Sequence, residues 1–250
     1  KIRDLTPPFA VKPGWRNDAY MSRYIKAHQV ATHDEAMALS CDILTLIPSL
    51  VVQEWAPGDD DSIWFCLQYH GHDGEVWASF VGRKFHTWPA GTGDLVSGHP
   101  APDDFGLTER TTSFFRRVGL RGWCALEFKQ HAETGKFLMI EPTVGRMDTF
   151  SELAVVNGVN LPLAGYSDLA GLPRPTPGVH PTATAWRKDW LINRKAARFK
   201  GKGALHGPEG MPIVDGIWRS SDPLPGLTAY PWRLLTGGSR AVLRKLGCWQ

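Results

Sequence analysis

Two short apolar segments, each carrying one glutamate, constrain this chain more than any other feature. Glu127 lies within the apolar stretch 125–129, and Glu141 ends the stretch 138–141. The turn signal Thr134-Gly135 between them predicts an antiparallel hairpin, in which facing residues lie about 5 Å apart. Because an unpaired charge is costly among apolar residues, two facing carboxylates indicate a shared cation. The alternative is a pair of solvated strand carboxylates.

Paired carboxylate oxygens suit Mg²⁺, which keeps several waters and is completed by substrate phosphates. Cationic residues at expected strand ends or adjoining loops could converge on a polyphosphate. They are Lys12, Lys26, Arg83, Lys84 and Arg146. Taken singly, each is also typical of a surface charge. No Walker P-loop is present, because the stretch 201–203 (Gly-Lys-Gly) lacks the rest of that motif.

A third group of polar residues follows the apolar segment that ends at Trp55. It runs through 53–58 (Gln-Glu-Trp-Ala-Pro-Gly) into the three aspartates 59–61. A strand that ends here exposes backbone groups to a flat heterocycle, and an acidic residue just beyond it can bind ribose hydroxyls. By itself, a strand that ends in Pro-Gly is also an ordinary turn.

The composition indicates a globular protein with a packed core. The chain has 250 residues, 42% of them hydrophobic, which suffices for one large or two modest domains. No stretch approaches the ~20 apolar residues of a membrane helix. Four scattered cysteines without a Cys-x-x-Cys pair argue against a zinc ribbon or a disulfide scaffold. Since no signal-peptide pattern is visible, we expect a cytoplasmic location.

Hydrophobic patterning and turn signals predict an α+β fold with antiparallel hairpins. The expected strands are 9–13, 26–30, 51–55, 62–69, 76–80, 124–129 and 137–141, and the expected helices are 107–118, 150–157 and one that begins at Thr32. We expect 14–24 and 83–96 to be irregular, and the loop 88–102 is a candidate lid. His70 and His72, which flank Gly71, are expected to be surface residues at a hairpin end.

The C-terminal part of the chain is strongly basic, with 13 Lys or Arg against 4 Asp or Glu between 170 and 250. A Pro- and Gly-rich boundary precedes it at 171–178. We expect a helix over 186–200 with Trp186 and Trp190 on one face. Such a helix packs its aromatic face on the domain, which we favour, or binds an anionic membrane or nucleic acid.

The order of these segments resembles the ATP-grasp superfamily, in particular its carboxylate–amine ligases. The matching stretches are 9–13, 26–27, 51–58, 83–84, 122–128, 140–146 and 157–162. The resemblance implies two ATP-grasp subdomains with antiparallel sheets, at 1–56 and 57–172, and an irregular basic extension at 173–250. Family members normally carry a further N-terminal domain, so we expect a fragment or a shortened protein.

The resemblance implies ATP binding by six residues. Two lysines would contact the phosphates and the adenine, a three-residue hinge would recognise the adenine edge, and an aspartate would lie near the ribose. In chain order these residues are Lys12, Lys26, Glu54, Trp55, Ala56 and Asp61.

The resemblance also implies the metal-binding and catalytic residues. Glu127, Glu141 and Thr143 would bind Mg²⁺, although the family usually has Asn where this chain has Thr143. Arg146 would stabilise the transferred phosphoryl group or the acyl phosphate, assisted by Arg83.

The implied activity is ATP-dependent ligation of a small-molecule carboxylate to an amine through an acyl phosphate, without a protein nucleophile. One rival interpretation is a non-catalytic ATP-grasp-like module that binds a nucleotide or a partner. Another is a surface-binding protein that acts through its basic tail. We expect no membrane span and no nucleic-acid partner, and leave homo-oligomers possible.

Overall fold

The computed structural model describes residues 2–89, 91, 93–178, 182–199 and 207–232. Two compact units are present, one containing the chain up to Pro57 and the other running from Gly58 to Leu227. Residues 179–181, 200–206 and 233–250 of the expected basic extension lie outside the described residues. Within the described ranges, no helix combines the length and the apolar character needed to cross a bilayer.

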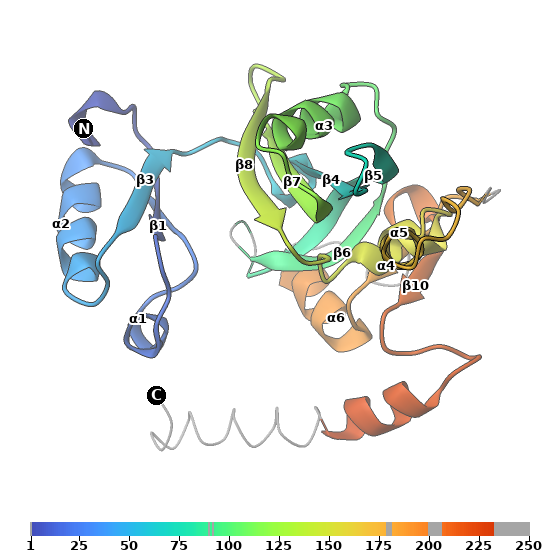
Figure 1. The fold of residues 1–250 in the computed structure, drawn as a ribbon. Helices are drawn as coiled ribbons and strands as arrows, with labels where there is room; N and C mark the ends of the chain where they lie inside the picture. The colour runs from blue at the N-terminus through green and yellow to red at the C-terminus, as the bar shows by residue number, and fades with distance from the viewer. Residues whose placement is uncertain (1, 90, 92, 179–181, 200–206, 233–250) are drawn as a thin grey trace. The chain divides into compact units, whose positions relative to one another are not determined.

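The first unit is a three-stranded antiparallel sheet in the order β2–β1–β3, packed against helices (Figure 1). Its elements are the 3-10 helix η1 (Ile2–Asp4), β1 (Phe9–Pro13), α1 (Asp18–Arg23), β2 (His28–Val30), α2 (His33–Leu44) and β3 (Leu50–Glu54). Phe9 and Val11 of β1 are fully buried against α2, where Ala36 and Ile43 meet them.

Two local signals account for the helices of this unit. The Thr32 hydroxyl caps α2 by accepting a hydrogen bond from the Glu35 N–H at 3.2 Å, as predicted. The prediction that 14–24 is irregular is wrong, because Asn17 caps α1. The Asn17 side chain accepts a hydrogen bond from the Tyr20 N–H at 2.8 Å.

The second unit contains a seven-stranded sheet in the order β10–β9–β6–β5–β4–β7–β8. Its strands are β4 (Ile63–His70), β5 (Val76–Trp88), β6 (Asp94–Pro100), β7 (Gly122–Gln130), β8 (Phe137–Val144), β9 (Ala185–Arg187) and β10 (Ile213–Asp215). Its helices are η2 (Asp60–Ser62), α3 (Leu107–Arg117), α4 (Ser151–Val156), α5 (Leu161–Leu169), α6 (Trp190–Phe199) and η3 (Pro208–Gly210). All pairings are antiparallel except that of β9 with β10.

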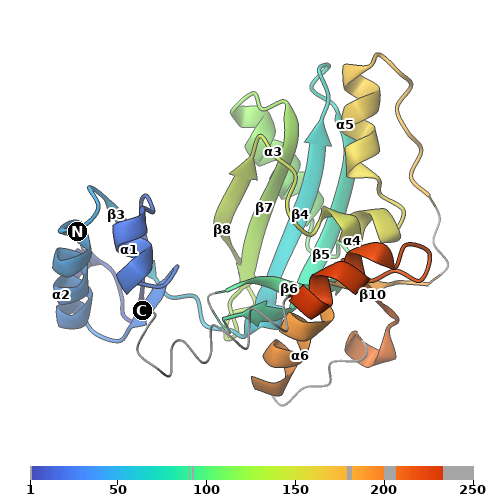
Figure 2. The same cartoon turned by 90° about the horizontal axis from the view of Figure 1, so that it is seen from below.

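Helices cover both faces of this sheet (Figure 2). On one face, α4 and α5 pack on alternate residues such as Phe65 and Leu67. On the other, α3 packs on the intervening residues, Trp64 and Cys66 among them. Because both faces are covered, all eight residues of β4 are buried and the strand lacks the polar alternation of a solvent-facing strand. The predicted α+β class is confirmed.

The prediction of a loop over 83–96 is wrong. β5 continues to Trp88, and β6 begins at Asp94, so most of the candidate lid at 88–102 is also strand. The Gly and Pro residues of this segment are typical of a loop. In the fold, however, its polar side chains find long-range partners, and the His86 Nδ1 lies 2.9 Å from the Ser97 hydroxyl.

Two further expectations are corrected. Trp186 lies in β9, which extends the sheet beside β6, and not in the helix that follows. His70 is fully buried, and only His72 is a surface residue. The packing interpretation of α6 holds, because Ala196 and Ala197 are buried on the sheet.

A carboxylate on α5 ties this helix to the hairpin between β4 and β5. The Asp168 Oδ2 accepts hydrogen bonds from the Tyr69 hydroxyl at 2.9 Å, the His72 N–H at 3.0 Å and the His72 Nδ1 at 2.7 Å. Desolvation raises the pKa of the Asp168 carboxyl, but the hydrogen bonds outweigh it and the net shift is downward. Burial and the bond to Asp168 raise the pKa of Tyr69 to about 12, so the phenol stays a donor.

This tie predicts an acid-dependent contribution to stability. A carboxyl whose pKa is lowered by folding stabilises the fold above its unfolded pKa, and the contribution is lost as the pH falls through the folded value. Asp168→Asn should therefore be less stable than wild type at pH 7, and the difference should shrink below pH of about 4. Urea unfolding of both proteins at a series of pH values measures this difference in unfolding free energy. Asp104→Asn, at an exposed position, is the control, and a pH-independent difference at Asp168 would contradict the assignment.

Candidate active site

The β7–β8 hairpin places Glu127 directly opposite Glu141, which confirms the predicted hairpin. Thr143 lies two residues beyond Glu141 on the same face, opposite Ala125. Since Phe65 of β4 pairs with Glu127, this is the sheet face that α4 and α5 cover further along. Glu141 is exposed, whereas Glu127 is mostly buried.

Lys84 on β5 forms an ion pair with Glu127 across β4. Its Nζ lies 2.8 Å from Oε1 and 2.9 Å from Oε2, so the ammonium bridges both carboxylate oxygens. Only 6% of the Lys84 side chain and 15% of the Glu127 side chain are exposed. A mostly buried cation thus compensates the carboxylate on which a metal site would depend.

Arg83 and Lys84 point to opposite faces of the sheet. The Arg83 guanidinium donates to the Asp61 carbonyl and lies 5.1 Å from the Trp64 ring centre, on the face that carries α3. The fold therefore brings Lys84, and not Arg83, to Glu127. Neighbouring residues of a strand point to opposite faces, whereas the loop that the sequence predicts here carries no such alternation.

Arg146 and Asp148 follow β8 in the connection to α4. The pKa of the Asp148 carboxyl is raised, chiefly by burial. A hydrogen bond from the Thr149 N–H opposes the shift, the charge of Glu127 adds to it, and the charges of Arg146 and Lys84 oppose it. These electrostatic effects indicate that the four charged side chains share one neighbourhood. Sequence reasoning missed Asp148, because no motif marks it.

The aspartates at 59–61 have different environments. Asp60 is buried, and its carboxylate accepts hydrogen bonds from the Thr87 N–H at 3.0 Å and the Gly91 N–H at 2.8 Å. It therefore anchors the end of β5. Asp61, the expected ribose contact, is half-buried and holds Arg83 through its backbone carbonyl.

The remaining expected nucleotide contacts lie in the first unit. Lys12 is half-buried on the central strand β1, opposite Val51, and Lys26 precedes β2 by two residues. The expected hinge begins at the end of β3. There Glu54 Oε1 accepts a hydrogen bond from the Thr6 N–H at 2.7 Å, and the Trp55 N–H donates to the Pro8 carbonyl at 2.8 Å. Ala56, the last hinge residue, is half-buried.

The site residues of the second unit fit a magnesium ion that depends on its substrate for ligands. Glu127, Glu141 and Thr143 offer the oxygen donors that Mg²⁺ prefers. Across the residues that the structure describes, no group of three or more His, Cys, Asp or Glu side chains could hold a metal. Water and phosphate oxygens would have to complete the coordination, and the ion would share Glu127 with Lys84.

Solved structures share this arrangement of strands and helices. An ADP complex of N5-carboxyaminoimidazole ribonucleotide synthetase (PurK) superposes with a TM-score of 0.60 over 80% of this chain and 51% of its own, at 12% identity. The chain has the ATP-grasp fold. The Thermus thermophilus form of the same synthetase gives a TM-score of 0.55 at 18% identity, over 74% of this chain and 47% of its own.

A third structure with the ATP-grasp fold contains a bound metal nucleotide. It is the biotin carboxylase domain of 2-oxoglutarate carboxylase from Hydrogenobacter thermophilus, a dimer with MgADP, ADP and bicarbonate. Its TM-score is 0.54 at 11% identity, over 70% of this chain and 39% of its own. The chain thus spans about half the length of these proteins or less. No family model matches the sequence, and no curated protein matches it.

Proposed function

We propose that this chain is an ATP-dependent ligase that activates a small-molecule carboxylate as an acyl phosphate and joins it to an amine, releasing ADP and phosphate. The observation that carries the proposal is the facing pair Glu127 and Glu141 on an ATP-grasp fold, with Lys84 beside it. Bound ADP and MgADP in two proteins of similar fold support nucleotide binding here. A cytoplasmic location remains part of the proposal.

In this proposal the residues of the second unit compensate the negative charge of the ATP phosphates and of the transition state. Glu127, Glu141 and Thr143 would hold Mg²⁺, which neutralises phosphate charge when bound. Lys84 and Arg146 would offset the negative charge that spreads over the phosphoryl oxygens in the transition state. We assign the role beside Glu127 to Lys84 in place of Arg83, because Arg83 lies on the opposite face of the sheet.

The nucleotide contacts are proposed from the resemblance. Lys12 and Lys26 would contact the phosphates and the adenine, the segment 54–56 the adenine edge, and Asp61 the ribose. No protein nucleophile is needed, because the substrate carboxylate attacks the γ-phosphorus and the amine then attacks the acyl phosphate. The amine displaces phosphate, so ATP is consumed once per bond formed.

A non-catalytic nucleotide-binding module is the second candidate. Two observations favour it. Thr143 is a weaker metal ligand than the usual Asn, and the ammonium of Lys84 already forms an ion pair with the carboxylate of Glu127. The two candidates differ in whether ATP is consumed, because both predict that it binds.

Calorimetric titration with ATP, in Mg²⁺ and in EDTA, tests the proposed site. Wild type is expected to bind more tightly in Mg²⁺. Glu141→Gln should weaken the Mg²⁺-dependent part about tenfold or more, because a ligand to the ion is lost. Glu141 is exposed, so the variant should fold, and Glu133→Gln in the exposed turn is the matched control.

Equal ATP affinity in Mg²⁺ and in EDTA would refute the metal site. So would an unchanged Mg²⁺-dependent affinity in the Glu141→Gln variant. If binding responds as expected, ADP release with mixtures of carboxylates and amines separates the two candidates. Release that requires both substrates identifies a ligase, and its absence across the mixtures favours the binding module.

A further inference from the structure

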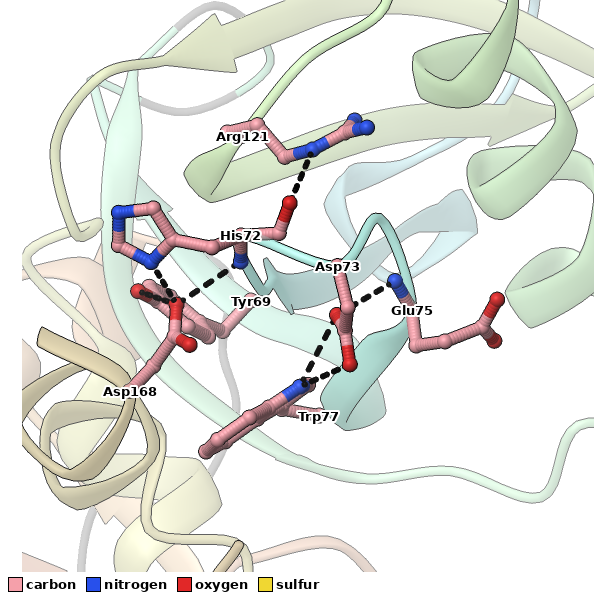
Figure 3. A network of polar contacts seen from close by, with 7 residues as sticks. All are labelled: Tyr69, His72, Asp73, Glu75, Trp77, Arg121 and Asp168. Atoms are coloured by element: carbon pink, nitrogen blue, oxygen red, sulfur yellow. Dashed lines mark hydrogen bonds and ion pairs between the residues drawn. The ribbon is translucent and has the colours of Figure 1, made fainter. Parts of the chain in front are cut away.

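A cavity of about 180 Å³ lies at the end of the sheet where β4 ends and β7 begins. Its main lining residues are Tyr69, His72, Arg121, Trp123, Asp168 and Leu169, and Figure 3 shows most of the polar contacts around it. It is separate from the candidate active site. Gly122 and Glu127 are five residues apart on β7, which corresponds to about 17 Å along a strand.

Two aromatic rings form a rigid wall of this cavity. The centres of Tyr69 and Trp123 are 5.3 Å apart, and the Trp123 indole N–H donates to the Leu161 carbonyl at 3.2 Å. Helix α5 packs directly on the indole, since a Cβ atom at Gly165 would lie 2.2 Å from the ring. The wall is therefore preformed, and it suits an apolar group.

Asp168 and Arg121, which carry opposite charges, both contact His72 at the rim of the cavity. The backbone N–H and the ring Nδ1 of His72 donate to Asp168, and its carbonyl accepts a hydrogen bond from the Arg121 Nε at 3.3 Å (Figure 3). A second guanidinium nitrogen, Nη1 of Arg121, donates to the Leu120 carbonyl at 2.9 Å. The Asp168 carboxylate and the Arg121 guanidinium thus lie on opposite sides of the His72 backbone and form no ion pair with each other (Figure 3).

Each of these charged groups keeps capacity for a ligand. All three hydrogen bonds to the Asp168 carboxylate end on Oδ2. In the part of the chain that the structure describes, Oδ1 accepts no hydrogen bond and Arg121 has no carboxylate partner. By contrast, the nearby Arg116 is paired with Glu75 at 3.0 Å. The cavity therefore offers an acceptor and a cationic donor beside an apolar wall.

We propose that this cavity binds a free α-amino acid with an apolar side chain. Its ammonium group would donate to Asp168 Oδ1, its carboxylate would accept from Arg121, and its side chain would lie against Trp123 and Leu169. A zwitterion matches two separated opposite charges better than a simple acid or a simple amine does, because each of those leaves one charge without a partner. The proposal does not depend on the proposed ligase activity.

Nuclear magnetic resonance of the full chain, labelled with ¹⁵N at the tryptophan indoles, tests the proposal. Trp123→Phe assigns the Trp123 resonance. Phenylalanine and leucine, titrated into the millimolar range, are expected to shift this resonance in a saturable way. Phenethylamine and 3-phenylpropanoate, which lack the carboxylate and the amine respectively, should bind at least about tenfold more weakly, because each loses a charge-assisted hydrogen bond.

Arg121→Gln should weaken phenylalanine binding about tenfold or more, whereas Arg117→Gln, an exposed arginine outside the cavity lining, should not. Leu169→Gln at the exposed rim should weaken the binding of phenylalanine more than that of alanine. This variant tests the proposal if Arg121→Gln folds poorly. Absence of saturable shifts, equal binding of either analogue, or equal effects of both arginine variants would overturn the proposal.

Discussion

Glu127→Gln is expected to destabilise the fold and to abolish most of the ATP turnover. The substitution leaves the mostly buried ammonium of Lys84 without its carboxylate. Breaking a buried ion pair on one side costs about 3–5 kcal/mol, and we expect the lower end because Glu127 is 15% exposed. If the chain is the proposed ligase, turnover should fall about 100-fold or more, since charge stabilisation at the transferred phosphoryl group would be lost. Urea unfolding and ADP release measure the two effects.

A double variant separates stability from chemistry. Lys84→Met combined with Glu127→Leu replaces the ion pair by apolar groups, an exchange that is often neutral or stabilising. We therefore expect unfolding close to that of wild type with turnover still lost, and Glu133→Gln should change neither. Wild-type turnover in the folded double variant would refute a role for this pair in catalysis.

Phe65→Ala should cost about 3–5 kcal/mol of unfolding free energy, the range for removing a buried phenylalanine. Phe65 is fully buried, and its ring centre lies 4.7 Å from that of Phe150. The absence of a side chain at Gly82 makes room for the ring, because a Cβ atom there would lie 2.5 Å from it. The neighbours are held in the sheet and in α4, so they can close the resulting cavity only in part.

The same variant should also weaken Mg²⁺-dependent ATP binding, because Phe65 is the strand partner of Glu127. Urea unfolding and calorimetry on the purified chain measure both effects. Leu138→Ala on β8, where the side chain is 41% exposed, is the control and should change stability by less than about 1 kcal/mol. A loss in Phe65→Ala no greater than in the control would contradict the assignment of Phe65 to the core.

Local signals in the sequence were enough for several elements. The turn at Thr134-Gly135 set the β7–β8 hairpin and with it the facing pair Glu127 and Glu141. The Thr32 cap set the start of α2. These features depend on residues that are near one another in the chain, so their geometry follows from turn and capping chemistry alone.

The α+β class, the hairpin and the ATP-grasp resemblance follow from local patterns and from the order of motifs along the chain. The pairing of Lys84 with Glu127 and of Arg83 with Asp61 follows instead from the tertiary fold. So do the burial of His70 and the addition of β9 to the sheet. Each of these features depends on strand pairing and packing between residues that are distant in the sequence. Such pairing supplies partners for charged and polar side chains, so these side chains can lie in the interior of the sheet.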